Sequence, residues 1–269
     1  MTAFEKYINI SNLNHSIICV GLDPVLDKLP IMLKKEIQSI EIFCRKIIEA
    51  TKDFVCGYKL NFAFFEQYGV EGYQILKSLF DFIPANLLKI ADAKRADIGN
   101  TSKAYAKSVF DYFQADAVTV NPYMGFDSVL PFFKSSDKLV FILALTSNPS
   151  SENFQKITIN GKPLYQLVVE NSIKWGTKYN TGFVVGATHP KELELIRDIA
   201  PNNIFLIPGI GAQGGDLEAI MKANKNGLAI INVSRAVIYS SSANDYDESA
   251  AKKVIELNNI INSFSYMRF

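Results

Sequence analysis

The sequence predicts a single α/β domain, a TIM (β/α)8 barrel that spans residues 1–269. Eight short apolar segments are spread along the chain, and each is followed by a longer amphipathic segment. Strands that alternate with helices pair in parallel, because the helix carries the chain back to the same edge of the sheet. Eight such units in about 250 residues fit a closed barrel better than an open doubly wound sheet.

The predicted strands are short apolar runs, as expected for parallel strands that are covered on both faces. Short stretches containing Pro, Gly and Ser fall where strand-to-helix loops are expected, and no stretch has the composition of a linker between domains. In chain order the predicted strands are 17–21, 54–60, 87–91, 117–120, 139–145, 182–186, 204–207 and 228–233.

Amphipathic stretches between these strands predict helices at 36–51, 66–82, 102–113, 127–133, 164–178, 190–199, 216–223 and 249–261. The pattern at 127–133 is the weakest of them. The stretch 147–163 is a polar run of Ser, Asn, Pro and Lys residues that is long for a strand-to-helix loop. Two interpretations remain open for it, a lid over a ligand or an ordinary surface excursion.

Composition argues against nucleic acid or a membrane as the partner. The formal net charge is +1, the basic residues are dispersed, and no apolar run approaches the roughly 20 residues of a membrane span. Cys19, Cys44 and Cys56 form an odd set without close spacing, which indicates reduced thiols and a cytoplasmic protein. The two histidines are too few and too far apart for a metal cluster. A small molecule or a second copy of the chain is the expected partner.

The segment 92–97, Asp-Ala-Lys-Arg-Ala-Asp, directly follows the apolar run 87–91. Side chains alternate along a strand, so Asp92 and Lys94 are expected on the same face, where a carboxylate can hold the lysine protonated as a proton donor. A salt bridge that merely closes the end of the strand is the alternative. Asp97 lies beyond the strand and could reach across a dimer interface instead.

Other polar residues follow strands that are distant in the sequence. In a TIM barrel the carboxyl ends of all eight strands meet at one face, where the chemistry occurs. Asp23, Lys59 and the segment 146–149, Thr-Ser-Asn-Pro, all lie at such ends. Any one of them could be a capping or salt-bridge residue. Together with the 92–97 segment they predict an active site.

A glycine-rich segment, 208–216, follows the seventh predicted strand, and Arg235 follows the eighth. Glycines let backbone N–H groups approach an anion closely, and an arginine adds a charged fork of donors. The loops after these two strands form the usual phosphate site of the fold. The sequence therefore predicts a phosphate-binding site here.

These residues resemble the orotidine 5′-phosphate decarboxylase family over nearly the whole chain. The resemblance rests on the Asp-x-Lys-x-x-Asp array at Asp92, Lys94 and Asp97, on Gly-Leu-Asp-Pro at 21–24, and on Lys59. It also rests on Pro-Gly-Ile-Gly-Ala-Gln-Gly-Gly at 208–215 and on Arg235. The sequence of residues 94–101, Lys-Arg-Ala-Asp-Ile-Gly-Asn-Thr, resembles that of the longer, bacterial-type branch of the family.

The resemblance implies decarboxylation of orotidine 5′-monophosphate to UMP, the last step of de novo UMP synthesis, without a metal or organic cofactor. Lys94 would protonate C6 of the pyrimidine between Asp92 and Asp97, the latter from the partner subunit of a homodimer with shared active sites. The implied binding residues are Asp23, Lys59 and the partner's Thr101 for ribose, Ser147 for the pyrimidine, and Gly211, Gln213, Gly214, Ser234 and Arg235 for phosphate.

Two positions depart from the family pattern. Ala96 and Ser234 stand where many members have glycine. Both replacements are small, and Ser234 would act through its backbone N–H, so activity is expected to survive. Two alternatives stay open: a Mg²⁺-dependent 3-keto-L-gulonate 6-phosphate decarboxylase with a similar acid and lysine array, and a catalytically dead barrel that binds nucleotide.

Overall fold

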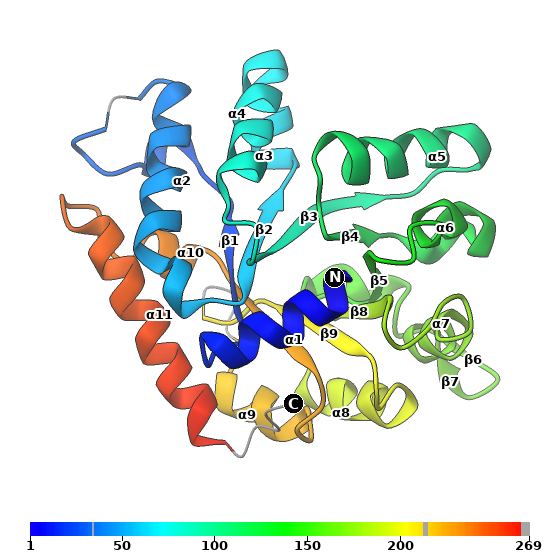
Figure 1. Ribbon diagram of the computed structural model, residues 1–269. Helices are drawn as coiled ribbons and strands as arrows, with labels where there is room; N and C mark the ends of the chain where they lie inside the picture. Colours follow the sequence, from blue (N-terminus) through cyan, green and yellow to red (C-terminus); the bar gives the residue numbers. More distant parts are fainter. Residues whose placement is uncertain (34, 212–214, 265–269) are drawn as a thin grey trace.

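The computed structural model describes residues 1–33, 35–211 and 215–264, and their main strands form a closed barrel (Figure 1). The order around the barrel is β1-β10-β9-β8-β5-β4-β3-β2, and neighbouring strands are parallel. The predicted fold class is confirmed. The barrel strands are β1 (Ile18–Leu22), β2 (Gly57–Asn61), β3 (Leu88–Arg95), β4 (Ala117–Val120), β5 (Leu139–Leu145), β8 (Thr181–Val185), β9 (Ile204–Pro208) and β10 (Ala229–Val233).

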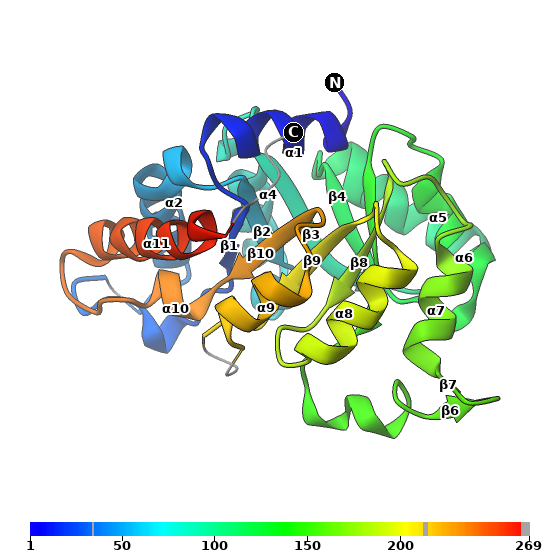
Figure 2. The same ribbon diagram turned by 90° about the horizontal axis from the view of Figure 1, so that it is seen from below.

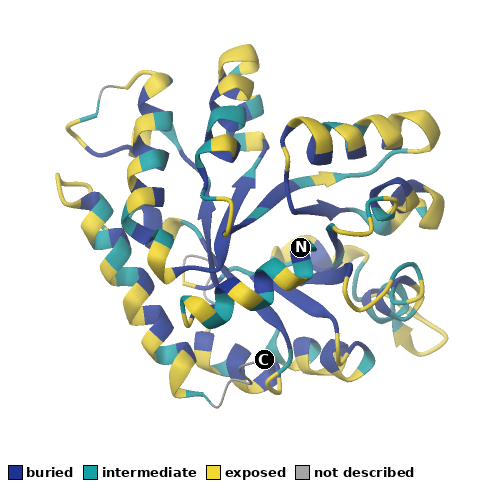
Figure 3. Ribbon diagram, viewed as in Figure 1, coloured by how far each residue is buried: buried dark blue, intermediate teal, exposed yellow. Residues whose placement is uncertain are grey.

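Helices surround the barrel and bury one face each against it (Figure 3). Their inner faces and the strands form a continuous apolar core, while their outer faces are exposed. No helix in the described ranges is both long and apolar enough to span a membrane. The main outer helices are α2 (Gln38–Thr51), α4 (Gly69–Phe82), α5 (Gly99–Lys107), α6 (Phe126–Phe133), α7 (Leu164–Ser172), α8 (Pro190–Ile199), α9 (Leu217–Ala223) and α11 (Tyr246–Ser263).

Several predicted elements differ from those observed. The helix expected at 164–178 ends at Ser172, and the strand expected at 87–91 continues to Arg95. The helix expected at 66–82 is broken into α3 (Ala63–Glu66) and α4, because Gly69 adopts a left-handed φ of 60°. The helix expected at 102–113 starts earlier, as α5, and continues as the π-helical turn η3 (Ser108–Tyr112). The strand expected from 54 starts at Gly57, because 52–54 form the 3₁₀ turn η2, whose carbonyls accept hydrogen bonds from side-chain amides instead of a strand.

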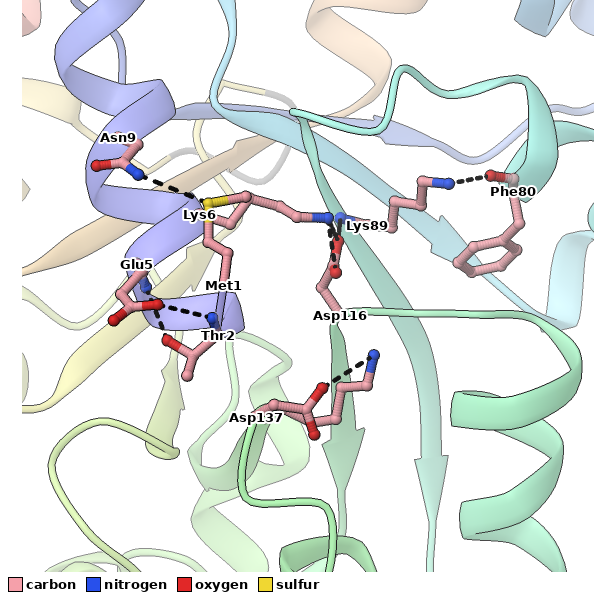
Figure 4. Close-up of polar contacts among 10 residues, drawn as sticks. Met1, Thr2, Glu5, Lys6, Asn9, Phe80, Lys89, Asp116 and Asp137 are labelled. Carbon is pink, nitrogen blue, oxygen red and sulfur yellow. Dashed lines mark hydrogen bonds and ion pairs between the residues drawn. The ribbon is translucent and has the colours of Figure 1, made fainter.

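An additional helix, α1 (Ala3–Leu13), lies across the amino-terminal end of the barrel (Figure 2). Thr2 and Glu5 form a capping box that starts it. Tyr7 donates its hydroxyl to the carbonyl oxygen of Ala229 at 2.7 Å, and Lys6 Nζ lies 2.8 and 2.9 Å from the two carboxylate oxygens of Asp116 (Figure 4). These bonds close this end of the barrel.

The long β5–α7 connection lies at the opposite end of the barrel (Figure 2). It holds the 3₁₀ turn η5 (Pro149–Asn153) and a short antiparallel hairpin of β6 (Thr158–Ile159) and β7 (Lys162–Pro163). The side chain of Gln155 accepts from the backbone N–H of Thr146 and donates to its hydroxyl, both at 2.8 Å. The connection is therefore tied back to the end of β5, and its role as a lid stays a prediction.

Candidate active site

A cavity of about 560 Å³ opens at the carboxyl ends of the barrel strands. Its apolar lining includes Leu143, Val184 and Leu206, which come from β5, β8 and β9. Six residues predicted from the sequence as site residues contribute to its polar wall: Asp23, Lys59, Asp92, Lys94, Ser147 and Arg235. A seventh, Ser234, also lines it. The barrel brings together side chains that are far apart in the sequence, from Asp23 to Arg235.

Asp92 is the buried centre of a charged array. Its Oδ2 lies 2.7 Å from Lys59 Nζ, and its Oδ1 lies 2.6 Å from Lys94 Nζ. Burial alone would raise the pKa of the Asp92 carboxyl, but the two ammonium groups outweigh burial and hold that pKa well below its usual value. Burial likewise acts to lower the pKa of Lys59, and the carboxylates of Asp23 and Asp92 outweigh it and raise that pKa. Both partners are therefore charged at neutral pH.

Lys94 reaches Asp92 from an irregular stretch of β3. Ala91 pairs with Val118 and Arg95 pairs with Val120, so the three residues 92–94 face only Thr119 of β4. Lys94 itself has a left-handed φ of 46°, an uncommon conformation for a residue other than glycine. The predicted pairing of Asp92 with Lys94 is observed, but a bulge accompanies it that simple alternation did not predict.

Thr119 is a site residue that the sequence did not reveal. It is buried, lines the cavity, donates its hydroxyl to Asp92 Oδ1 at 3.0 Å and accepts the backbone N–H of Lys94 at 3.0 Å. Its segment, Ala-Val-Thr-Val, reads as an ordinary apolar strand. Thr119 is recognised only from its position opposite residues 92–94 in the sheet, and this pairing is known only from the structure.

The wall formed by β1 and β10 contains buried polar atoms without partners. Among the described residues, Asp23 Oδ1, Asn232 Oδ1 and Ser234 Oγ have no hydrogen-bond partner. Lys59 Nζ is 3.7 Å from Asp23 Oδ1, an ion-pair contact that is too long for a hydrogen bond. Buried polar groups are normally satisfied, so these atoms indicate where a bound molecule or water supplies hydrogen bonds. Asn232 is a second residue that the sequence did not reveal.

The loop after β1 is held by a tyrosine from the segment that follows the neighbouring strand β10. Val25 donates its backbone N–H to the hydroxyl of Tyr239 at 2.7 Å, and Tyr239 follows the short helix α10 (Arg235–Ile238). Burial raises the pKa of Tyr239 to about 12, so its hydroxyl stays protonated. The loop that carries Asp23 and the helix that carries Arg235 are thereby connected.

The predicted phosphate end is described in part. Gly209 and Ile210 line the cavity together with Arg235. The guanidinium of Arg235 forms no hydrogen bond or ion pair with another described residue. Gly209 and Gly211 have φ values of 105° and 75°, a backbone conformation that is strained for a residue with a side chain. Gln213 and Gly214 lie outside the described residues.

Asp97 and Thr101 do not line the cavity of their own chain. Asp97 accepts a hydrogen bond from the backbone N–H of Ile98 at 2.8 Å, and Thr101 is exposed in the first turns of α5. The structure therefore brings together Asp92 and Lys94 of the predicted catalytic set and leaves Asp97 outside it.

Ligands for a metal do not gather at this site. Within the described residues, no three His, Cys, Asp or Glu side chains are grouped so that they could hold a metal ion. The two carboxylates in the cavity, Asp23 and Asp92, both lie against Lys59. Hard cations prefer oxygen ligands that are not already neutralised in this way. The arrangement suits recognition of an anion with hydroxyl groups and delivery of a proton.

The comparisons with known proteins agree with this geometry. A family model described as "Orotidine 5'-phosphate decarboxylase / HUMPS family" matches residues 16–252. The chain belongs to this family. An orotidine 5'-phosphate decarboxylase of Dehalococcoides mccartyi (strain ATCC BAA-2100) is 46% identical over 271 residues and covers 98% of both chains.

Solved structures of the orotidine 5'-phosphate decarboxylase family also match. An OMP decarboxylase of Leishmania donovani is 37% identical, with a TM-score of 0.85 over 97% of this chain and 100% of that chain. A UMP synthase of Leishmania donovani is 38% identical, with a TM-score of 0.86 over 97% of this chain but only 57% of that longer chain. The family predicted from the motifs is confirmed by the family model and by these relatives.

Proposed function

We propose that this protein decarboxylates orotidine 5′-monophosphate to UMP and carbon dioxide, without a metal or organic cofactor. The observation that carries this proposal is the array Lys59–Asp92–Lys94, centred on a buried carboxylate, in a cavity that Arg235 also lines. A nucleotide monophosphate has the matching chemistry, with a phosphate at one end and a reactive pyrimidine at the other. Membership of the family supports the same substrate.

In the proposed reaction the bond between C6 and the carboxylate carbon breaks, carbon dioxide leaves, and the electron pair remains on C6. The ammonium of Lys94 stabilises this developing charge and gives its proton to C6, which yields UMP. Asp92 holds that ammonium at 2.6 Å and keeps it in place for the transfer. Lys94 is half exposed toward the cavity, so solvent can return its proton after product release.

The remaining roles follow the walls of the cavity. Asp23 and Lys59 bind ribose hydroxyls, which would satisfy the unpartnered Asp23 Oδ1. Ser147, at the end of β5, binds the pyrimidine amide. Arg235 binds the phosphate, together with Gln213 and the backbone N–H groups of Gly211, Gly214 and Ser234. Phosphate binding far from the reacting carbon supplies energy that organises the reacting end.

We propose further that the enzyme is a homodimer in which Asp97 and Thr101 of the partner subunit complete each site. Both residues lie outside the cavity of their own chain, on the segment that follows β3. Apolar side chains are exposed beside them: Ile98 after β3, and Tyr123 and Met124 after β4. Exposed apolar residues grouped at neighbouring strand ends are typical of a surface that another chain covers.

The reducing cytoplasm is the proposed location. Cys19, Cys44 and Cys56 are buried and free, and burial raises the pKa of each thiol. The thiols therefore behave as small apolar groups and need no oxidising compartment.

Purified protein incubated with orotidine 5′-monophosphate and excess EDTA tests the reaction. We expect rapid loss of substrate absorbance in the ultraviolet and formation of UMP, abolished in Lys94→Ala and retained in Lys252→Ala, an exposed lysine on α11. Turnover that requires added Mg²⁺ would contradict the cofactor-free reaction. Binding of UMP without turnover, in folded protein, would indicate a catalytically dead barrel.

Mixing Lys94→Ala subunits with Asp97→Ala subunits tests the shared site. A mixed dimer has one site with both substitutions and one site with neither. Random exchange makes about half of the dimers mixed, so about a quarter of the original activity should return. Subunit exchange is verified by mass spectrometry. If activity does not return although exchange has occurred, the contribution of the partner's Asp97 is overturned.

A further inference from the structure

The bulge in β3 leaves one backbone donor without a partner in the sheet. In a regular parallel ladder each N–H pairs with the neighbouring strand, but residues 92–94 face a single residue of β4. The N–H of Lys94 donates instead to the side-chain oxygen of Thr119, at 3.0 Å. A buried backbone N–H needs such an acceptor, so Thr119 replaces the missing ladder bond at the residue with the left-handed φ.

The same hydroxyl also contacts the carboxylate. Since its oxygen accepts from Lys94 N–H, its own hydrogen is available to Asp92 Oδ1, 3.0 Å away. That carboxylate oxygen also receives Lys94 Nζ at 2.6 Å. One hydroxyl therefore joins the backbone of Lys94 to the carboxylate that holds the side chain of Lys94.

We infer that Thr119 is a positioning residue for the decarboxylation: it fixes the backbone and, through Asp92, the ammonium of Lys94 relative to the substrate. This inference rests on the proposed function. The adjacent residues Val118 and Val120 make the regular strand pairings, so the hydroxyl of Thr119 is not needed for the register of β4. Its β-branched side chain has a restricted χ1, which keeps the hydroxyl in one orientation.

Two pairs of variants separate the hydroxyl from the packing. The original threonine and Thr119→Val have nearly the same shape, and only the threonine carries a hydroxyl. Thr119→Ser and Thr119→Ala likewise differ only in the hydroxyl. We expect loss of the hydroxyl to lower kcat roughly 10- to 100-fold within each pair, because small displacements of a reacting group have effects of that order. The Kd of UMP, measured by calorimetry, should change less than about threefold, since Asp23, Ser147 and Arg235, which are proposed to bind the nucleotide, are unchanged.

Thr181→Val is the matched control. Thr181 is an equally buried threonine at the amino end of β8, and its hydroxyl donates to Asn180. This variant should have a lower melting temperature but an unchanged kcat. A kcat for Thr119→Val within twofold of the original protein, or equal losses in Thr119→Ser and Thr119→Ala, would overturn the inference. If the valine variant does not fold, the serine and alanine pair decides.

Failure of the proposed function is recognised separately, because the unsubstituted protein would then not convert orotidine 5′-monophosphate. Crystal structures judge the inference in that event. We expect Lys94 Nζ to leave Asp92 Oδ1 in Thr119→Val, from its present 2.6 Å, and the φ of Lys94 to change from 46°. An unaltered Lys94 in that structure would overturn the positioning role.

Discussion

The two ends of the barrel each contain a buried lysine–aspartate pair, and the pairs differ in what surrounds them. At the amino-terminal end, Asp116 accepts from Lys6 at 2.8 and 2.9 Å and from the backbone N–H of Lys89 at 2.9 Å (Figure 4). At the carboxyl end, Asp92 lies between Lys59 and Lys94, beside Asp23, which has an unpartnered oxygen.

The difference shows that a buried ion pair alone does not identify an active site. In the pair at the amino-terminal end Lys6 belongs to α1, both groups have partners, and the pair attaches this helix to the barrel. The pair at the carboxyl end borders a cavity in which hydrogen-bonding groups remain unsatisfied. Unused hydrogen-bonding capacity next to a cavity, rather than charge, distinguishes the functional end.

Replacing each aspartate with asparagine breaks one pair at a time, and the largest effect is expected at the carboxyl end. Asp92→Asn should lower kcat/KM roughly 10³-fold, because Lys94 loses the charge that holds it. Asp116→Asn should leave kcat within about threefold, since no residue of the cavity contacts Asp116. Steady-state decarboxylation at 25 °C measures both. Similar losses of activity in the two variants would show that the ends are not functionally distinct.

The same substitution at the amino-terminal end should act on stability. Asp116→Asn leaves the Lys6 ammonium mostly buried without a counter-charge, which should lower the free energy of unfolding by about 2 kcal/mol. Urea denaturation measures this, and Lys252→Ala, at an exposed site, controls for loss of a surface charge. An unchanged midpoint and slope would mean that this ion pair does not contribute to the attachment of α1.

A smaller effect is expected from the contact between β1 and β10. A Cβ placed on Gly21 would lie 2.8 Å from Ser234 Cβ and 3.2 Å from Asn232 Oδ1. Gly21→Ala should therefore separate Asp23 from Arg235 and raise KM roughly tenfold, given a cost of about 1–3 kcal/mol for overpacking. Lys252→Ala, at an exposed site on α11, serves as the control. Equal KM values for Gly21→Ala and the original protein would show that the close contact of Gly21 with Ser234 does not control substrate binding.

The smallest expected effect concerns pH: the stabilisation by Asp92 should not change between pH 5.5 and 8.5. Lys59 and Lys94 outweigh burial and lower the folded-state pKa of Asp92 below its unfolded value of about 4. The stabilisation by this ionised carboxylate is complete above about pH 4 and is lost only as the pH falls toward the folded-state pKa. The difference in the free energy of unfolding between the original protein and Asp92→Asn should therefore be the same at pH 5.5 and at pH 8.5, within about 0.5 kcal/mol. A difference that shrinks at pH 5.5 would show that Asp92 takes up a proton there.

Much of the fold and of the site could be predicted from the sequence, for physical reasons. Strands buried on both faces are apolar runs, so the eight barrel strands were visible, and polar residues at their carboxyl ends had to meet at one mouth. Asp23, Lys59, Asp92 and Lys94 were found in this way, and they lie together.

Other features depend on contacts that a pattern does not contain. Thr119 lies within an apolar strand, and its importance comes from a bulge in the neighbouring strand. Asn232 is likewise a single polar residue inside an apolar run, and its burial is known only once β10 meets β1. The helix α1 was missed because a short amphipathic segment becomes a helix only when a barrel end is there to cover. Whether Asp97 and Thr101 complete a site depends on a second chain.

The pairing of β1 with β10 has a consequence for synthesis of the protein. The first and last barrel strands carry Asp23 and Arg235 at their ends, and they are neighbours only after the ring has closed. During translation, every earlier intermediate is an open sheet with two bare edges, a form that is prone to pair with other chains. An interrupted polypeptide that lacks β10 would thus be inactive and prone to aggregate, so catalytic competence is acquired in one late step.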